Sequence, residues 1–184
     1  MLDQQLQYAT RGAAAVADVT AAMKMHVHDI GRGAPLALPK RVDWVAMVDR
    51  QLSTCRRFGT SMGVLSIGID GLDDIEQRYG KEVRERLLQL VWARLRSRLR
   101  STDQVALVGE QEFGAMVLDV TGAAAVAVHA RVADALCAPY RLGAQLLAMP
   151  VGTGAAFYPQ AGSTGEALAH MARQARMLRC DDEL

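Results

Sequence analysis

Two short apolar runs on either side of a compact polar turn place the strongest constraint on the fold of this chain. Residues 105–107 read VAL, residues 114–118 read GAMVL, and the hexapeptide VGEQEF (108–113) joins them. Apolar runs around a glycine-containing turn predict an antiparallel β-hairpin. Two acids and a glutamine around one glycine fit either an ordinary solvated hairpin tip or the remnant of a binding site.

The segments around this hairpin alternate between helical and strand-like patterns. Ser163 and Glu166 have the spacing of a capping box at the start of the last helix. The order of the elements predicts an α+β fold with the hairpin in its sheet. We expect helices over 40–58, 71–80, 81–100, 122–140 and 163–178, and strands over 61–70, 104–108, 113–118 and 146–159.

The first thirty residues form a segment of their own. Apolar and small residues recur over 2–30 at alternating spacings of three and four, which is the stripe of a helix about four heptads long. Such a helix could dock on its own domain or pair with a second copy as a signalling helix. His26 and His28 would point in different directions on that helix, so no metal site is expected there. A Gly/Pro-rich linker, 31–39, follows.

The composition of the chain excludes several function classes. It has 184 residues, 51% of them hydrophobic, and a net charge of +1 that gives no general attraction to nucleic acid or membranes. No stretch reaches the ~18 apolar residues of a membrane span, and no signal peptide is evident. Cys55, Cys137 and Cys180 are far apart, so we expect neither a disulfide framework nor a zinc site, and we expect a cytoplasmic protein.

Four stretches carry a specific resemblance. LALPKR (36–41) is similar to LTGLPNR, LSIGIDGLDDIEQRYG (65–80) to LLLDIDHFKQINDRYG, LRSTDQVALVGEQEF (99–113) to LRxxDLVARxGGDEF, and GTGAAFYP (152–159) to SIGVALYP. In this order and spacing they resemble the GGDEF domain, the diguanylate cyclase family of bacterial signalling, over roughly residues 35–180.

The resemblance implies a fold and a domain plan. The fold is nucleotidyl-cyclase-like, with a central, mainly antiparallel five-stranded sheet flanked by helices and preceded by an N-terminal helix. The domain plan is an N-terminal stalk or dimerisation helix (1–32), a GGDEF domain (33–180) and a short tail (181–184).

The resemblance also implies a chemistry, because the family joins two GTP molecules into cyclic di-GMP with the help of two metal ions. The first metal-binding carboxylate of the family falls at Gly68, which offers no ligand. The second falls at Gln111, whose amide binds Mg²⁺ far more weakly than a carboxylate. Asp70 matches a family aspartate that is not the main metal ligand. We therefore expect no metal-binding and no catalytic residues.

The nucleotide-binding positions of the family also differ here. The second signature glycine falls at Glu110 and a phosphate-binding lysine at Asp73, so a triphosphate would meet two anions. The two guanine-reading positions, an asparagine and an aspartate in the family, fall at Glu76 and Glu85. A late family lysine falls at about Cys180.

Three residues of the signature match the family. We expect Gly109 to hold the turn, Phe113 to lie in the core, and Glu112 to make a surface salt bridge or to accept a hydrogen bond. Together with Glu110 and Gln111 they form a degenerate signature.

One family site is complete in this sequence. The product-binding motif RxxD reads RSTD, from Arg100 to Asp103, and the family's secondary arginine falls at Arg131. Arginine can bond guanine O6 and N7 or grip a phosphate, and aspartate can accept from guanine N1–H and N2–H₂. The alternative is a solvated i,i+3 pair at a helix end. The basic run RLRSRLR (94–100) is interpreted as the solvated face of a helix, without nucleic-acid binding.

Three functions remain open at this point. The leading hypothesis is a catalytically inactive domain that binds cyclic di-GMP through Arg100, Asp103 and Arg131, without any other cofactor. The second is a pseudoenzyme that forms a homodimer or meets a protein partner through its N-terminal helix and binds no nucleotide. The third is a working cyclase with unusual ligands.

Overall fold

The computed structural model describes residues 43–142 and 145–178, and it confirms the α+β class. The expectations for the N-terminal helix (1–32), the linker (31–39), the position of Cys180 and the tail (181–184) lie outside the described residues. The helices are α2 (Trp44–Phe58), α3 (Leu72–Tyr79), α4 (Lys81–Ser97), α5 (Gly122–Cys137) and α6 (Gly165–Gln174). The strands are β1 (Met62–Ile69), β2 (Gln104–Leu107), β3 (Glu112–Leu118), β4 (Tyr140–Leu142), β5 (Gln145–Leu147), β6 (Val151–Tyr158) and β7 (Met177–Leu178).

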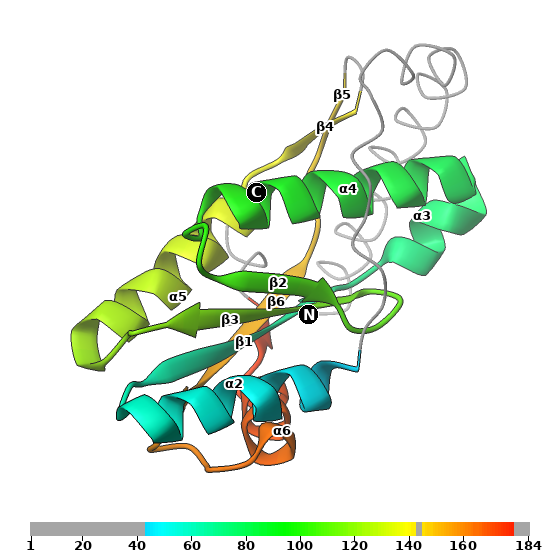
Figure 1. Ribbon diagram of the computed structural model, residues 1–184. Coiled ribbons are helices and arrows are strands. Elements are labelled where there is room, and N and C mark those ends of the chain that lie inside the picture. Colours follow the sequence, from blue (N-terminus) through cyan, green and yellow to red (C-terminus); the bar gives the residue numbers. More distant parts are fainter. Residues whose placement is uncertain (1–42, 143–144, 179–184) are drawn as a thin grey trace, which may run out of the picture.

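The central sheet has five strands in the order β2-β3-β1-β6-β7, and every neighbouring pair is antiparallel. The expected five-stranded antiparallel sheet is therefore confirmed. Figure 1 shows α4 and α5 on one face of the sheet and α2 and α6 on the other. Strands β4 and β5 form a separate two-stranded ribbon. All eight residues of β1 are buried, as the central strand of a sheet covered on both faces requires.

The alternation of side chains along β1 divides the core into two layers. Leu65 and Ile67 pack with residues of α4 and α5, whereas Met62 and Val64 pack with residues of α2 and α6. Side chains of a strand point alternately to its two faces, so one apolar strand supplies both layers. Within the described part of the chain, each helix is too short or too polar to cross a membrane.

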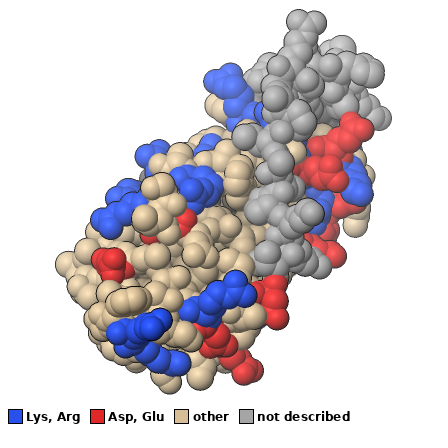
Figure 2. Space-filling model, viewed as in Figure 1, with Lys and Arg blue, Asp and Glu red and all other residues tan. Residues whose placement is uncertain are grey.

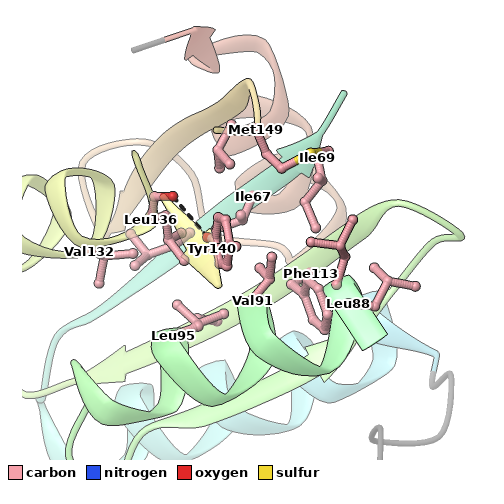
Figure 3. Close-up of a cluster of buried hydrophobic side chains, with 14 of the residues drawn as sticks. Ile67, Ile69, Leu88, Val91, Leu95, Phe113, Val132, Leu136, Tyr140 and Met149 are labelled. Atoms are coloured by element: carbon pink, nitrogen blue, oxygen red, sulfur yellow. Dashed lines mark hydrogen bonds between the residues drawn. The ribbon is translucent and has the colours of Figure 1, made fainter. Parts of the chain in front are cut away.

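Tyr140 joins α4, α5 and the ribbon on the larger core layer (Figure 3). Its side chain is buried, and its hydroxyl donates a hydrogen bond of 2.8 Å to the Leu136 carbonyl. The Arg94 guanidinium lies 3.8 Å from the centre of the ring, and Arg94 Nη2 donates to the Pro139 carbonyl at 2.8 Å. Burial raises the pKa of Tyr140 to about 12, although Arg94 opposes the shift.

Two glycines allow close approach between layers. An added Cβ at Gly114 would come within 2.5 Å of the Trp44 ring, so the indole of α2 packs directly on β3. An added Cβ at Gly154 would collide with the backbone of Ala172 and Arg176. The end of α6 therefore lies against β6, and this contact sets the position of the Arg176 backbone, two residues after the helix ends.

Two predicted boundaries around β4 and β6 are wrong. The helix expected over 122–140 ends at Cys137 because Ala138, which precedes Pro139, is extended with φ −63° and ψ 142°. Proline disfavours a helical conformation at the residue before it. The strand expected over 146–159 is two strands, β5 and β6, and Pro150 lies between them.

The capping box predicted at Ser163 and Glu166 is also wrong. The N-cap is Thr164, whose hydroxyl accepts a hydrogen bond from Ala167 N at 3.2 Å. Gly165 N donates to Asp49 Oδ1 of α2 at 2.6 Å, and this tertiary bond fixes which residue begins the helix. The helix ends at Gln174, and residues 177–178 join the sheet as β7, contrary to the helix expected through 178.

The cysteines differ from the expectation as well. Cys55 is a free, buried thiol, as expected for a reduced cysteine. Cys137 is disulfide-bonded, although the spacing of the cysteines led us to expect no disulfide framework.

Replacing Leu87 by alanine tests the core layer between the sheet and α4. Leu87 is fully buried, so the free energy of unfolding should fall by roughly 2–5 kcal/mol through lost burial and the cavity that remains. Leu146→Ala is the matched control, because Leu146 is 62% exposed. Urea unfolding should show a large loss for the first variant only, and equal losses would contradict the assignment of this layer.

Candidate functional site

The signature residues 109–113 lie in the turn between β2 and β3 and at the start of β3. Val108 N and Gly109 N both donate to the Glu112 carbonyl, at 2.9 and 3.2 Å, which closes the turn. Phe113 is fully buried in the core, as predicted. Gly109 lies close to Glu112, since an added Cβ would come within 3.2 Å of the Glu112 Cβ. The hairpin predicted from the sequence is confirmed.

Glu112 is the centre of an ionic network on the α6 face of the sheet. Its Oε1 accepts hydrogen bonds from Ser66 Oγ at 3.0 Å and Arg173 Nε at 3.1 Å, and it lies 4.0 Å from Arg176 Nη1. The predicted salt bridge of Glu112 is therefore present, but it is less exposed than expected, because the Glu112 side chain is only 19% exposed.

Arg176 occupies the position to which the resemblance assigns a metal-binding carboxylate. A Cβ built on Gly68 would collide with Arg176 Nη1 and would lie 2.9 Å from its Cζ. Gly68, Asp70, Gly152 and Arg176 line a small cavity of about 170 Å³ at this point. The positively charged guanidinium of Arg176 therefore lies directly over Gly68.

Arg84 holds the hairpin from the opposite face of the sheet. Its Nη2 donates to the Glu110 carbonyl at 2.9 Å, and its Nε forms an ion pair with Glu76 Oε2 at 3.1 Å. The Arg84 side chain is only 13% exposed. Arg84 thus joins α3, α4 and the hairpin tip, next to the positions that the resemblance assigns to guanine and to the nucleotide approach.

The other acidic residues of this region face solvent. Asp73 is exposed, and Glu85 pairs only loosely with Lys81 of the same helix, at 3.8 Å. Figure 2 shows acidic side chains gathered over the α3 end of the molecule. Among the described residues, no group of three or more His, Cys, Asp and Glu side chains is arranged to hold a metal ion.

The RxxD motif lies at a second place, on the turn between α4 and β2. Arg100 is exposed, and Asp103 N donates to the Arg100 carbonyl at 3.1 Å to close the turn. Arg131 of α5 is also exposed and reaches the same turn, since its Nη2 donates to the Arg98 carbonyl at 3.0 Å. The structure thus brings the two predicted arginines to one surface, although they are 31 residues apart in the sequence.

Asp103 differs from the two arginines because it is only 6% exposed. Its Oδ2 accepts from Arg100 N at 2.8 Å, and its Oδ1 accepts from Leu118 N at 3.2 Å. Arg96 Nη1 donates to the Asp103 carbonyl at 2.8 Å. Asp103 therefore ties the turn to the end of β3.

Three functional candidates were not found from the sequence: Arg84, Arg173 and Arg176. Their only sequence signal is the presence of arginines at the start of α4 and the end of α6. Each contacts the hairpin across more than 20 residues of sequence, and no local pattern encodes such a contact.

Replacing Arg84 by alanine should loosen the hairpin. The variant loses a hydrogen bond from a charged donor and a partly exposed ion pair, so amide hydrogen exchange over 108–113 should rise by roughly fivefold, about 1 kcal/mol. Arg86→Ala is the matched control, since Arg86 Nη1 donates to Gln89 Oε1 of its own helix at 3.1 Å. Mass-spectrometric exchange measures both, and unchanged protection in Arg84→Ala would contradict the role of Arg84.

Comparisons with known proteins identify relatives of this chain. The family model "diguanylate cyclase, GGDEF domain" matches residues 37–178. The diguanylate cyclase TpbB of Pseudomonas aeruginosa is 27% identical over 150 residues, which are 80% of this chain and 34% of TpbB. This chain thus spans about a third of the length of that curated relative.

Solved structures agree with the sequence comparison. The isolated GGDEF domain of TpbB superposes with a TM-score of 0.68 at 27% identity, over 82% of this chain and 95% of that one. The GGDEF domain of DgcB from Caulobacter crescentus, solved in complex with c-di-GMP, shares the fold at 17% identity with a TM-score of 0.65, over 78% of this chain and 83% of that one. The chain belongs to the GGDEF family of diguanylate cyclase domains.

Proposed function

We propose that this GGDEF domain is catalytically inactive and acts as a receptor for cyclic di-GMP in bacterial second-messenger signalling. The ligand would bind at the turn that carries Arg100 and Asp103, with Arg131 as the third member of the site. The observation that supports the proposal is the convergence of Arg131 and the RxxD motif on one exposed turn, while Arg176 covers Gly68, to which the resemblance assigns a metal ligand.

The lack of activity is supported by the charges in the cleft. The donor set does not fit a metal pair, because Gly68 has no side chain, Gln111 offers an amide, and Arg176 places a cation above Gly68. The exposed side chains of Asp73 and Glu110 would face a triphosphate without intervening metals. At an effective dielectric constant of about 20, each added anion within several ångströms would cost a few kcal/mol.

The receptor role is supported by the chemistry of the exposed turn. Guanidinium groups donate in a planar fork that matches phosphate oxygens and the O6/N7 edge of guanine. Cyclic di-GMP carries two phosphates and two guanines, so two converging arginines give it matched partners. Figure 2 shows basic side chains over α4 and the neighbouring surface on the left of the view.

A second candidate is an interaction module that binds no nucleotide. The apolar and small-residue stripe over 2–30 motivates it, and that segment lies outside the described residues. A homodimer or a protein partner would then be held by the N-terminal segment. This candidate predicts that deleting residues 1–30 abolishes self-association and that cyclic di-GMP has no effect on it.

Incubation with GTP and either Mg²⁺ or Mn²⁺ tests the loss of activity. We expect no cyclic di-GMP above background, because the cleft cannot assemble the two metal ions that stabilise phosphoryl transfer. Chromatography of the reaction mixture measures the product, and a diguanylate cyclase that is active under the same conditions serves as control. Formation of product at a rate proportional to protein concentration would refute the proposed inactivity.

Isothermal titration with cyclic di-GMP tests the receptor role. The unmodified chain should bind at tens of micromolar protein or less, and Arg100→Ala and Arg131→Ala should each weaken binding by roughly tenfold or more, since each removes a charged donor. Arg57→Ala, an exposed arginine on α2, is the matched control and should bind normally. The absence of binding heat, or full binding by Arg100→Ala, would exclude this site.

A further inference from the structure

We propose that Cys137 is joined to Cys180 and that this disulfide is a redox-controlled link, which holds the last strand, β7, and Arg176 on the sheet. Reduction of the link would release the end of the chain and uncover the cavity beside Gly68. The proposed link does not depend on the binding of cyclic di-GMP.

The partner of Cys137 follows from the cysteines of the chain. Cys137 is disulfide-bonded, whereas Cys55 is a free thiol that is only 2% exposed. The sequence holds three cysteines, which leaves Cys180, beyond the described residues, as the partner. Strand β6 contacts α5 and pairs with β7. Helix α5, which ends at Cys137, and β7, which ends two residues before Cys180, therefore share one neighbour.

Strand β7 is short and lies at the edge of the sheet. It consists of Met177 and Leu178, which pair with Thr153 and Gly152 of β6. Two residues of an edge strand near a chain end detach readily unless something ties them down. A disulfide supplies that tie, because it closes residues 137–180 into a loop and so restricts the detached state.

Arg176 directly precedes β7, so the same link bears on its guanidinium. An added Cβ at Gly68 would collide with Arg176 Nη1, and this nitrogen lies 4.0 Å from Glu112 Oε1. The backbone of Arg176 is held on one side by the end of α6, which approaches Gly154, and on the other side by β7. Detachment of β7 removes one of these two supports. The guanidinium would then leave Gly68 more often and open the cavity of about 170 Å³ beside it.

Reduction of the link needs a dithiol that can reach one of its sulfurs. Ala138 and Pro139, next to Cys137, are exposed, whereas Cys55 is buried on the inner face of α2. A thiolate of the reductant attacks one sulfur, and the S–S bond breaks to leave a mixed disulfide and one cysteine thiolate. The second thiol of the reductant then breaks the mixed disulfide. The products are one oxidised dithiol and two cysteine thiols, which take up the two protons of the dithiol.

Peptide mapping of the chain, equilibrated with oxidised glutathione, tests the partner. Free thiols are alkylated in denaturant, and trypsin then gives peptides 132–141 and 180–184, which carry Cys137 and Cys180. We expect these peptides to be linked, with a mass two hydrogens below their sum, and Cys55 to be alkylated. A dithiol added before alkylation should separate them. A link to Cys55, or no link between these two peptides, would overturn the inference.

Hydrogen exchange on the oxidised and the reduced chain tests the effect on β7. Exchange over 176–178 should rise by roughly tenfold or more on reduction, because the local opening of β7 is no longer restricted. Trypsin should also cleave faster after Arg176. Residues 44–58 of α2 should keep their exchange rate. Equal exchange over 176–178 in the two states would show that the link does not hold β7.

Two cysteine variants separate the link from other effects of the reductant. Cys137→Ser should exchange like the reduced chain, with or without a dithiol. Cys55→Ala, the matched control, should keep the difference between the oxidised and the reduced state. A redox-dependent difference that persists in Cys137→Ser would contradict the inference. If Cys137→Ser does not fold, the two redox states of the unmodified chain decide.

Discussion

The ion pairs of Glu112 determine how the signature hairpin sits on the rest of the domain. Glu112 lies opposite Gly68 in the β1–β3 register, so its carboxylate stands beside a strand position that has no side chain. Helix α6 brings Arg173 and Arg176 to that carboxylate, and it can do so because Gly154 lets its last turn approach β6. A carboxylate that is 19% exposed would be costly without these partners, so the register and the helix position support each other.

Arg84 of α4 holds the same hairpin from the opposite face of the sheet. Arg84 bonds the backbone of Glu110 and pairs with Glu76, while Arg176 lies above Gly68. Both guanidinium groups are permanently charged and directional, so they can neutralise acids and satisfy carbonyls without a metal ion. The Glu110 carbonyl and the Glu112 carboxylate are therefore engaged within the chain, and helices on both faces of the sheet hold the hairpin.

Local patterns in the sequence account for much of this architecture. The apolar runs around VGEQEF and the helical periodicity of 81–100 predict β2, β3 and α4, because strand and helix periods are set by adjacent residues. The boundary at Thr164 was missed because Ser163 and Thr164 are both competent caps, and a bond from Gly165 to Asp49 on another helix selects one of them. The contacts of Arg84 and Arg176 were missed for the same reason, since they depend on tertiary packing.

The arginines around the RxxD turn have a structural role at the end of α4. The last carbonyls of a helix lack partners within the helix and carry the negative end of its dipole, so arginines are favoured there even without a ligand. Arg131 bonds the Arg98 carbonyl and Arg96 bonds the Asp103 carbonyl. One N–H group of Arg131 is thus bonded to the helix end, while the rest of this exposed guanidinium faces solvent. An anchored guanidinium loses less freedom on binding than a free one, so the bonds that stabilise the helix end are consistent with the ligand site proposed at this turn.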